Sequence, residues 1–187
     1  FNTDYHMRTS CYLILAGFSC LLYIGCTPAY YKLHQSGYKK IEEKNYDGAM
    51  KDFDSSLVLN NEYWLAYLNR GTTFAVTGNC QRALFDLNKS IELHRKNPIA
   101  FNNRAMCKSE WNENEGAIAD YKEAIRLDSK FYLAYTRLGL LYAKLDSCEQ
   151  AVHYLKIAVD KKAYNECMEE QQVNEALRKC TLKSGTK

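Results

Sequence analysis

The chain has 187 residues, of which 47% are hydrophobic and 25% are charged, and its formal net charge is +3. This length suits about one domain, and the apolar content excludes a disordered chain. Lys and Arg are spread along the sequence beside Asp and Glu, which argues against a nucleic-acid-binding surface. Nine glycines and two prolines are too few for an all-β chain of this length, so we expect helices with short connections.

Residues 1–26 have the layout of an export signal. Arg8 gives a positive start after Met7, and the apolar run from Cys11 to Ile24 is shorter than a membrane-spanning helix needs. The residues that end at Cys26 resemble a bacterial lipobox, in which the cysteine is lipidated and becomes the new N-terminus. The resemblance implies a lipid anchor at Cys26 in the bacterial envelope. Because Thr27 and not Asp follows the cysteine, the resemblance favours a location at the outer membrane, facing the periplasm.

Two alternatives for this segment stay open. An uncleaved anchor could run on through Tyr31, interrupted by Pro28, and hold the protein at the inner membrane. A chance apolar leader would leave the protein in the cytoplasm. Residues 27–29 form a short linker in each case.

A 34-residue period fills most of the remaining chain. Four alanines recur at this spacing without insertion, and a large apolar residue follows each of them by four positions. This spacing places the two residues on one helical face, where the small one lets paired helices approach and the large one fills the space. The alanines are Ala49, Ala83, Ala117 and Ala151, and the large residues are Phe53, Leu87, Tyr121 and Leu155.

The pattern resembles the tetratricopeptide repeat (TPR) family over residues 30–165. The resemblance implies an all-α solenoid of four helix-turn-helix repeats, at 30–63, 64–97, 98–131 and 132–165. Lys40 and Lys108 stand where the family usually has an aromatic residue, so we expect looser packing near the turns of the first and third repeats.

A further helix is expected over residues 166–180, followed by a tail at 181–187. Its apolar residues share one face, as a helix that closes the open end of a solenoid requires. These residues are Val173, Ala176, Leu177 and Cys180.

In the TPR family the first helix of each pair lines a concave groove, which implies a protein or peptide partner. Asn69, Asn103 and Arg137 hold the sixth position of successive repeats, as in TPR co-chaperones that grip a C-terminal carboxylate. Leu65 and Leu133 replace the lysines of those co-chaperones, which removes charged donors. We therefore expect a partner with apolar anchors, backbone contacts to the two amides and one acidic group. The predicted groove comprises Asn69, Asn103, Arg137, Leu65, Ile99, Leu133, Met106 and Leu140.

The alternative for these polar residues is that Asn is common at this position in the family and that Arg137 is a solvated surface charge. The groove is a prediction that rests on register alone.

The cysteines and histidines predict no metal site, because they show no metal-ligand spacing. Cys80 and Cys107 fall on helices expected to be adjacent, and Cys148 and Cys180 are related in a similar way. Disulfides could form at either place in an exported protein. For any one of these cysteines, a small buried apolar residue is the simpler interpretation.

No nucleophile, phosphate-loop or zinc-protease motif is present in the sequence. We therefore predict no catalytic residue, no cofactor, no small-molecule substrate and no nucleic-acid partner. The predicted function is that of a membrane-tethered scaffold that binds a protein or peptide. The alternatives are a cytosolic peptide-binding co-chaperone and an accessory fragment of a larger enzyme.

Overall fold

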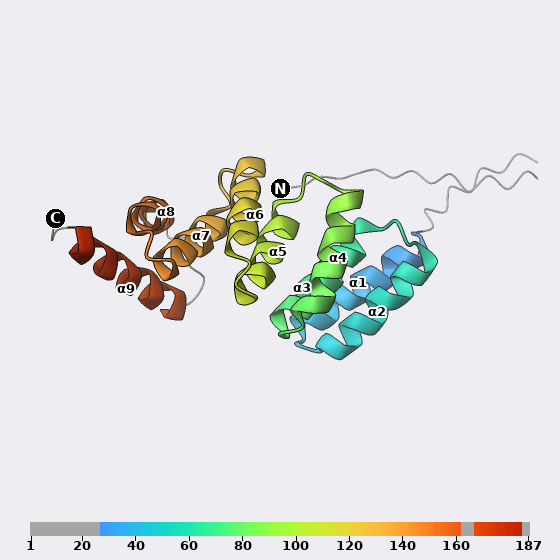
Figure 1. The fold of residues 1–187 in the computed structure, drawn as a ribbon. Coiled ribbons are helices and arrows are strands. Elements are labelled where there is room, and N and C mark those ends of the chain that lie inside the picture. Colours follow the sequence, from blue (N-terminus) through green and yellow to red (C-terminus); the bar gives the residue numbers. More distant parts are fainter. Residues whose placement is uncertain (1–26, 162–166, 185–187) are drawn as a thin grey trace, which may run out of the picture.

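The computed structural model describes residues 27–161 and 167–184, and these residues form nine α-helices without a strand (Figure 1). The leader at 1–26, with Cys26, lies outside the described residues, as do 162–166 and 185–187. The helices are α1 (Ala29–Glu42), α2 (Tyr46–Leu59), α3 (Trp64–Val76), α4 (Cys80–Leu93), α5 (Pro98–Glu110), α6 (Asn114–Leu127), α7 (Tyr132–Lys144), α8 (Cys148–Asp160) and α9 (Cys167–Ser184).

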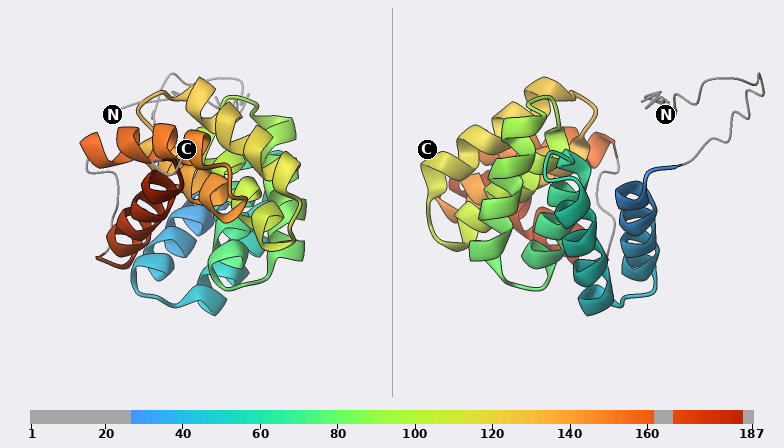
Figure 2. Two further views of the ribbon diagram at one scale, coloured as in Figure 1. Left: turned by 60° about the vertical axis from the view of Figure 1, so that its left-hand side comes forward. Right: turned by 90° about the vertical axis from the view of Figure 1, so that its right-hand side faces the viewer.

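The helices form four consecutive hairpins, and α9 follows the last of them. Each helix packs against its hairpin partner, and α1, α3, α5, α7 and α9 also contact one another in succession. The hairpins follow one another along a coil, with helices such as α6 and α8 toward its periphery (Figure 2). The predicted all-α solenoid is confirmed. Among the described residues, none of the helices is long and apolar enough to cross a membrane.

Small residues set the distance between the two helices of a hairpin. A Cβ on Gly139 of α7 would lie 2.7 Å from Cδ2 of Leu155 on α8, and a Cβ on Gly37 would lie 2.7 Å from Cε1 of Phe53. Both distances are below van der Waals contact, so a larger residue would push the helices apart. The large residues that fill this space, Phe53 and Leu155 among them, have no exposed surface. Ala49, Ala83, Ala117 and Ala151 are also fully buried, which confirms the packing role predicted for the repeating alanines.

The turn inside each hairpin has the same backbone conformation four times. Its central residue has a positive φ: 58° at Lys44, 81° at Gly78, 60° at Asn112 and 55° at Asp146. These residues are spaced by 34, so the repeat extends to the backbone of the turn. In the first two turns the next residue is an asparagine whose side chain caps the following helix, by accepting a hydrogen bond from a backbone N–H.

We expect Lys44→Gly to raise the free energy of unfolding by about 0.5 kcal/mol. The left-handed conformation costs a lysine about 1–2 kcal/mol, which exceeds the extra chain entropy that glycine loses on folding. Urea denaturation measures the change. The matched control is Lys51→Gly inside α2, which should lower the free energy of unfolding by about 1 kcal/mol. A loss of stability in both variants would contradict the assigned strain at Lys44.

An aspartate recurs on the second helix of the first three hairpins, paired with a cation on the first helix, and it is buried in the second and third hairpins. Nε and Nη2 of Arg70 both donate to Asp86 at 2.7 Å. Arg104 grips Asp120 in the same way, at 2.8 and 2.6 Å, and Nζ of Lys108 adds a third contact at 2.8 Å. In the first hairpin Nζ of Lys40 lies 2.7 Å from Asp52.

These contacts give a different role to Lys40 and Lys108 from the one expected. Each lysine stands where an aromatic residue is usual, yet its ammonium group reaches across the hairpin to the repeating aspartate. The stem of Lys108 also packs over Gly116, since a Cβ built there would lie 3.2 Å from Cδ of the lysine. An ion pair thus stands in place of the missing ring in both hairpins, and in the third hairpin an aliphatic stem does so as well, while looser packing of these turns stays a prediction.

Two disulfides connect neighbouring elements of the array. Cys80 at the start of α4 is bonded to Cys107 on α5, with their Cα atoms 5.1 Å apart. Cys148 at the start of α8 is bonded to Cys180 on α9, with a Cα separation of 4.9 Å. Both pairings raised by the sequence are present. The interpretation of these cysteines as merely small apolar residues is therefore wrong, although Cys80, Cys107 and Cys180 are also buried.

Helix α9 closes the C-terminal end of the array. Val173 and Cys180 are buried, and Ala176 packs into a cluster with Ala143 of α7 and Ala151 of α8. The predicted tail begins too early, because α9 continues to Ser184. A contact with the turn between α7 and α8 holds this last part of the helix: Nζ of Lys183 donates to Asp146 at 2.6 Å.

Candidate functional site

The candidate groove is formed by the first helices of the hairpins. Helices α1, α3, α5 and α7 contact one another in succession, so residues at the same repeat position lie in a row along one face of the array. The sixth position contributes Asn69 from α3, Asn103 from α5 and Arg137 from α7. The structure thus places the three predicted polar residues on successive helices.

The side-chain amides of Asn69 and Asn103 are each hydrogen-bonded to the first helix of the previous hairpin. Nδ2 of Asn69 lies 2.9 Å from Nε2 of His34 on α1, and Nδ2 of Asn103 donates to Oγ1 of Thr72 on α3 at 2.9 Å. Oδ1 of Asn103 accepts from Asn102 at 3.0 Å, and Asn103 is only 8% exposed. Each amide therefore joins one repeat to the next. A peptide backbone would have to displace these bonds to use the buried Asn103, at a cost of about 1 kcal/mol each.

His34 is held neutral inside this row. Its ring is buried between Phe53 and Tyr63, and burial lowers the pKa of His34 from 6.5 to about 4. Since an amide nitrogen has no lone pair to accept with, Asn69 donates to Nε2. The ring proton then belongs on Nδ1, which faces the Tyr63 hydroxyl at 3.4 Å. Protonation of Nε2 would break the bond to Asn69.

The buried histidine makes stability depend on pH in a defined direction. The folded-state pKa of His34 lies below the unfolded value, so the unfolded chain takes up its proton first as the pH falls through 6.5. We expect the free energy of unfolding to decrease by about 3 kcal/mol between pH 7 and pH 4 from this group, and to level off below pH 4. Urea denaturation across this range should show a smaller decrease for His34→Gln. The exposed His153 gives the control, because His153→Gln should retain the full slope. An identical slope in all three proteins would contradict the role given to His34.

Arg137 differs from the two amides because one of its donors is unused. Its Nη1 is buried and has no hydrogen-bond partner among the described residues. The guanidinium is close enough to Tyr121 of α6 to affect its ionisation. Burial raises the pKa of Tyr121 to about 12, and the charge of Arg137 opposes this rise. Arg137 is half-buried, so it is not the solvated surface charge of the alternative interpretation.

The apolar residues of the predicted groove differ in their exposure. Ile99 is 44% exposed, whereas Leu65 and Met106 are half-buried and pack partly against the core of the second repeat. Leu133 and Leu140 on α7 are also half-buried. Tyr38 of α1 was not in the predicted set, although it holds the ninth position of its repeat, and it is 51% exposed.

The sequence analysis did not predict that His34 and Thr72 would bond the two amides of the candidate groove. Each lies about one repeat before the amide that it bonds, since His34 is 35 residues before Asn69 and Thr72 is 31 before Asn103. A spacing of about one repeat could therefore have indicated these hydrogen-bond partners from the sequence. In the described part of the chain, no group of His, Cys, Asp and Glu side chains could hold a metal ion.

Known proteins share this architecture. The family model described as "TPR repeat" matches residues 110–146, which span the turn of one hairpin, α6 and α7. Among curated proteins, no sequence matches this chain. Many solved structures share its fold.

Three of these solved structures illustrate the likeness. A crystal structure of MamA protein has a TM-score of 0.69 at 22% identity, over 83% of this chain and 87% of that one. The first TPR of Spaghetti (RPAP3), bound to HSP90 peptide SRMEEVD, has a TM-score of 0.61 at 20% identity, over 63% and 93%. A tetratricopeptide repeat protein from Parabacteroides merdae has a TM-score of 0.65 at 21% identity, over 82% and 60%. The solenoid of this chain is thus a TPR fold.

Proposed function

We propose that this TPR-fold chain is a protein-interaction scaffold that binds a segment of another protein along α1, α3, α5 and α7. One observation carries the proposal. Exposed apolar side chains, Tyr31, Tyr38 and Ile99, occur on the same row of helices as the half-buried cationic side chain of Arg137. Apolar anchors together with one cationic side chain are what an extended or helical peptide with an acidic group would use.

The hydrogen bonds of Asn69 and Asn103 within the array indicate which kind of peptide would bind. Because both amides are bonded within the array, side-chain anchors contribute more to binding than a clamp on the peptide backbone. The structural relative RPAP3 was solved with an HSP90 peptide, which supports a peptide ligand for this chain as well. Leu65 and Leu133 stand where lysines would grip a carboxylate, so the ligand of this chain is less acidic and more apolar.

Photocrosslinking tests which face of the array is used. Benzoylphenylalanine at Ile99 should crosslink to a partner in cells, whereas the same residue at Val58 on α2 should not. Val58 is a matched control because it is apolar and 85% exposed, but belongs to a second helix. Arg137→Ala in the Ile99 protein should reduce the crosslinked product severalfold without lowering the melting temperature. Equal crosslinking from both positions would contradict the assignment of the groove.

We further propose that the scaffold is exported and tethered to a bacterial membrane by lipid on Cys26, with the outer membrane favoured. The two disulfides support an exported location, because disulfides persist in oxidising compartments and are rare in the cytosol. Labelling with an alkyne fatty acid should mark the wild type and not Cys26→Ala. Unlabelled wild-type protein would contradict the anchor, and it would leave the proposal for the groove unaffected.

A further inference from the structure

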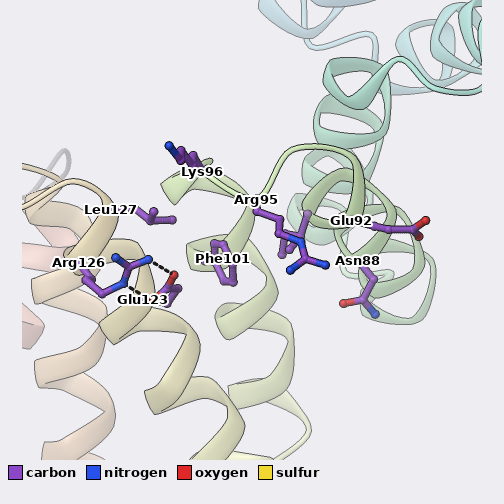
Figure 3. Close-up of a pocket in the computed structure, with 9 residues that line it drawn as sticks. Asn88, Glu92, Arg95, Lys96, Phe101, Glu123, Arg126 and Leu127 are labelled. Atoms are coloured by element: carbon purple, nitrogen blue, oxygen red, sulfur yellow. Dashed lines mark hydrogen bonds and ion pairs between the residues drawn. The ribbon is translucent and has the colours of Figure 1, made fainter.

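A cleft of about 620 Å³ lies on another part of the molecule, between α4, α6 and the loop that joins α4 to α5. Phe101 of α5 lies in the middle, with Arg126 and Glu123 of α6 on one side and Arg95 and Asn88 on the other (Figure 3). Apart from Phe101, its lining residues come from the second helices α4 and α6 and the loop between α4 and α5, and none of them belongs to the predicted groove.

The base of the cleft is apolar and held in place from below. Phe101 is half-buried, as are Ile91 and Leu127 beside it. The guanidinium carbon of Arg104 lies 5.2 Å from the ring centroid of Phe101, and its Nη1 donates to Asn88 at 2.8 Å. Arg104 is itself fixed by Asp120. The base is therefore formed before any ligand binds, which lowers the entropy that binding must overcome.

Two of the cationic side chains that line the cleft form no ion pair within the described residues. Glu123 accepts two hydrogen bonds from Arg126, and Glu92 pairs with Lys89, so these groups neutralise one another. Arg95 and Lys96 line the cleft as well, and neither has an ion-pair partner in the described part of the chain. The local surplus is positive and complements a carboxylate-bearing ligand.

The same loop carries no such pair of cations in the neighbouring repeats. The positions of Arg95 and Lys96 are held by Asn61 and Glu62 one repeat earlier. One repeat later they are held by Ser129 and Lys130. The cationic pair is therefore specific to this loop and is not a general feature of the solenoid. Lys130 provides a cation at the matching place for a control.

We propose that this cleft is a second docking surface, which binds an acidic segment of a partner protein carrying one large apolar side chain among its carboxylates. The apolar side chain packs on Phe101, Ile91 and Leu127, and the flanking carboxylates pair with Arg95 and Lys96. A partner could thus be held at two places, and linked binding at two weak sites raises the overall affinity.

Fluorescence anisotropy with a defined probe tests this surface on the folded chain. The probe is a labelled peptide of acidic residues around one central Phe. We expect its affinity to fall at least about tenfold in Arg95→Glu/Lys96→Glu, because two attractive contacts become repulsive. It should change less than about twofold in Lys130→Glu. The milder Arg95→Gln/Lys96→Gln should show an intermediate loss, and the circular dichroism melting curve confirms that each variant is folded.

Three outcomes would overturn the proposal. One is an equal loss in Lys130→Glu, since any surface cation would then suffice. Another is a peptide with Gly in place of Phe that binds as well as the probe, since the apolar base would then have no role. The third is a tenfold loss in Arg137→Ala, which would move the acidic peptide to the groove of the proposed function. A failure here leaves that function intact, because its photocrosslinking reports on Ile99 alone.

Discussion

Replacing Asp86 by alanine should lower the free energy of unfolding by about 3 kcal/mol. Asp86 is 1% exposed and accepts two hydrogen bonds from Arg70, a side chain that is itself largely buried. Burial raises the pKa of Asp86 and the Arg70 guanidinium opposes that rise, so the carboxylate depends on this partner. Removing it leaves a guanidinium with unsatisfied donors between α3 and α4, which costs about 3–5 kcal/mol in buried pairs. Urea denaturation at pH 7 measures the loss.

A second carboxylate that pairs with Arg70 provides the control for the Asp86 variant. Asp54 of α2 also bonds Arg70, but its side chain is 60% exposed. Asp54→Ala should therefore cost no more than about 1 kcal/mol. Asp86→Asn preserves the shape and one acceptor, and should fall between the two. If Asp54→Ala and Asp86→Ala were equally destabilised, the burial of Asp86 would not be what makes its pair important.

Reduction of the disulfide between Cys80 and Cys107 should lower the free energy of unfolding by about 3.5 kcal/mol. The bond closes a loop with a sequence separation of 27, and loop-closure entropy in the unfolded chain gives this magnitude. A reductant opens both disulfides of the wild type, so the loss due to this bond is the wild-type effect of the reductant minus its effect in a variant that lacks the bond. The double variant Cys80→Ala/Cys107→Ala should lose the part of the reductant effect that this bond supplies.

The other disulfide gives a local effect against which the first can be judged. Opening the bond between Cys148 and Cys180 releases only α9 from the end of the array. Cys148→Ala/Cys180→Ala should increase hydrogen exchange in α9 and leave exchange in α4 and α5 unchanged. Alkylation by iodoacetamide of Cys80 or Cys107 in protein folded without reductant would show that the first bond is not formed.

The 34-residue period was sufficient to predict the fold, because it fixed which residues share a hairpin. Ala49 with Phe53, and Gly139 with Leu155, behave as the spacing predicts. The role of Lys40 was not predicted. The sequence shows that a lysine replaces the usual aromatic residue, but the ion pair depends on Asp52, which lies 12 residues further along on the opposite helix. A charge on one helix can be judged only with the charge it meets across the hairpin.

The groove was predictable in register but not in hydrogen bonding. The sequence places Asn69 and Asn103 on successive first helices, and the structure shows them there. Whether an amide is free for a partner depends on the side chain opposite it on the previous helix, here His34 and Thr72. Rotamers and helix separation decide that contact, and neither follows from a repeat pattern. The cleft above Phe101 was missed for a similar reason, since its walls come from two different repeats.

The closing of one end by α9 also affects how copies of this protein can associate. Solenoids that stack end to end need two complementary open ends, and such head-to-tail contacts extend into filaments when they do not close. Here the terminal surface of α7 and α8 is covered by α9, which is fixed by the disulfide to Cys180 and by the contact of Lys183 with Asp146. The described C-terminal face of α7 and α8 is therefore not available for such a head-to-tail contact.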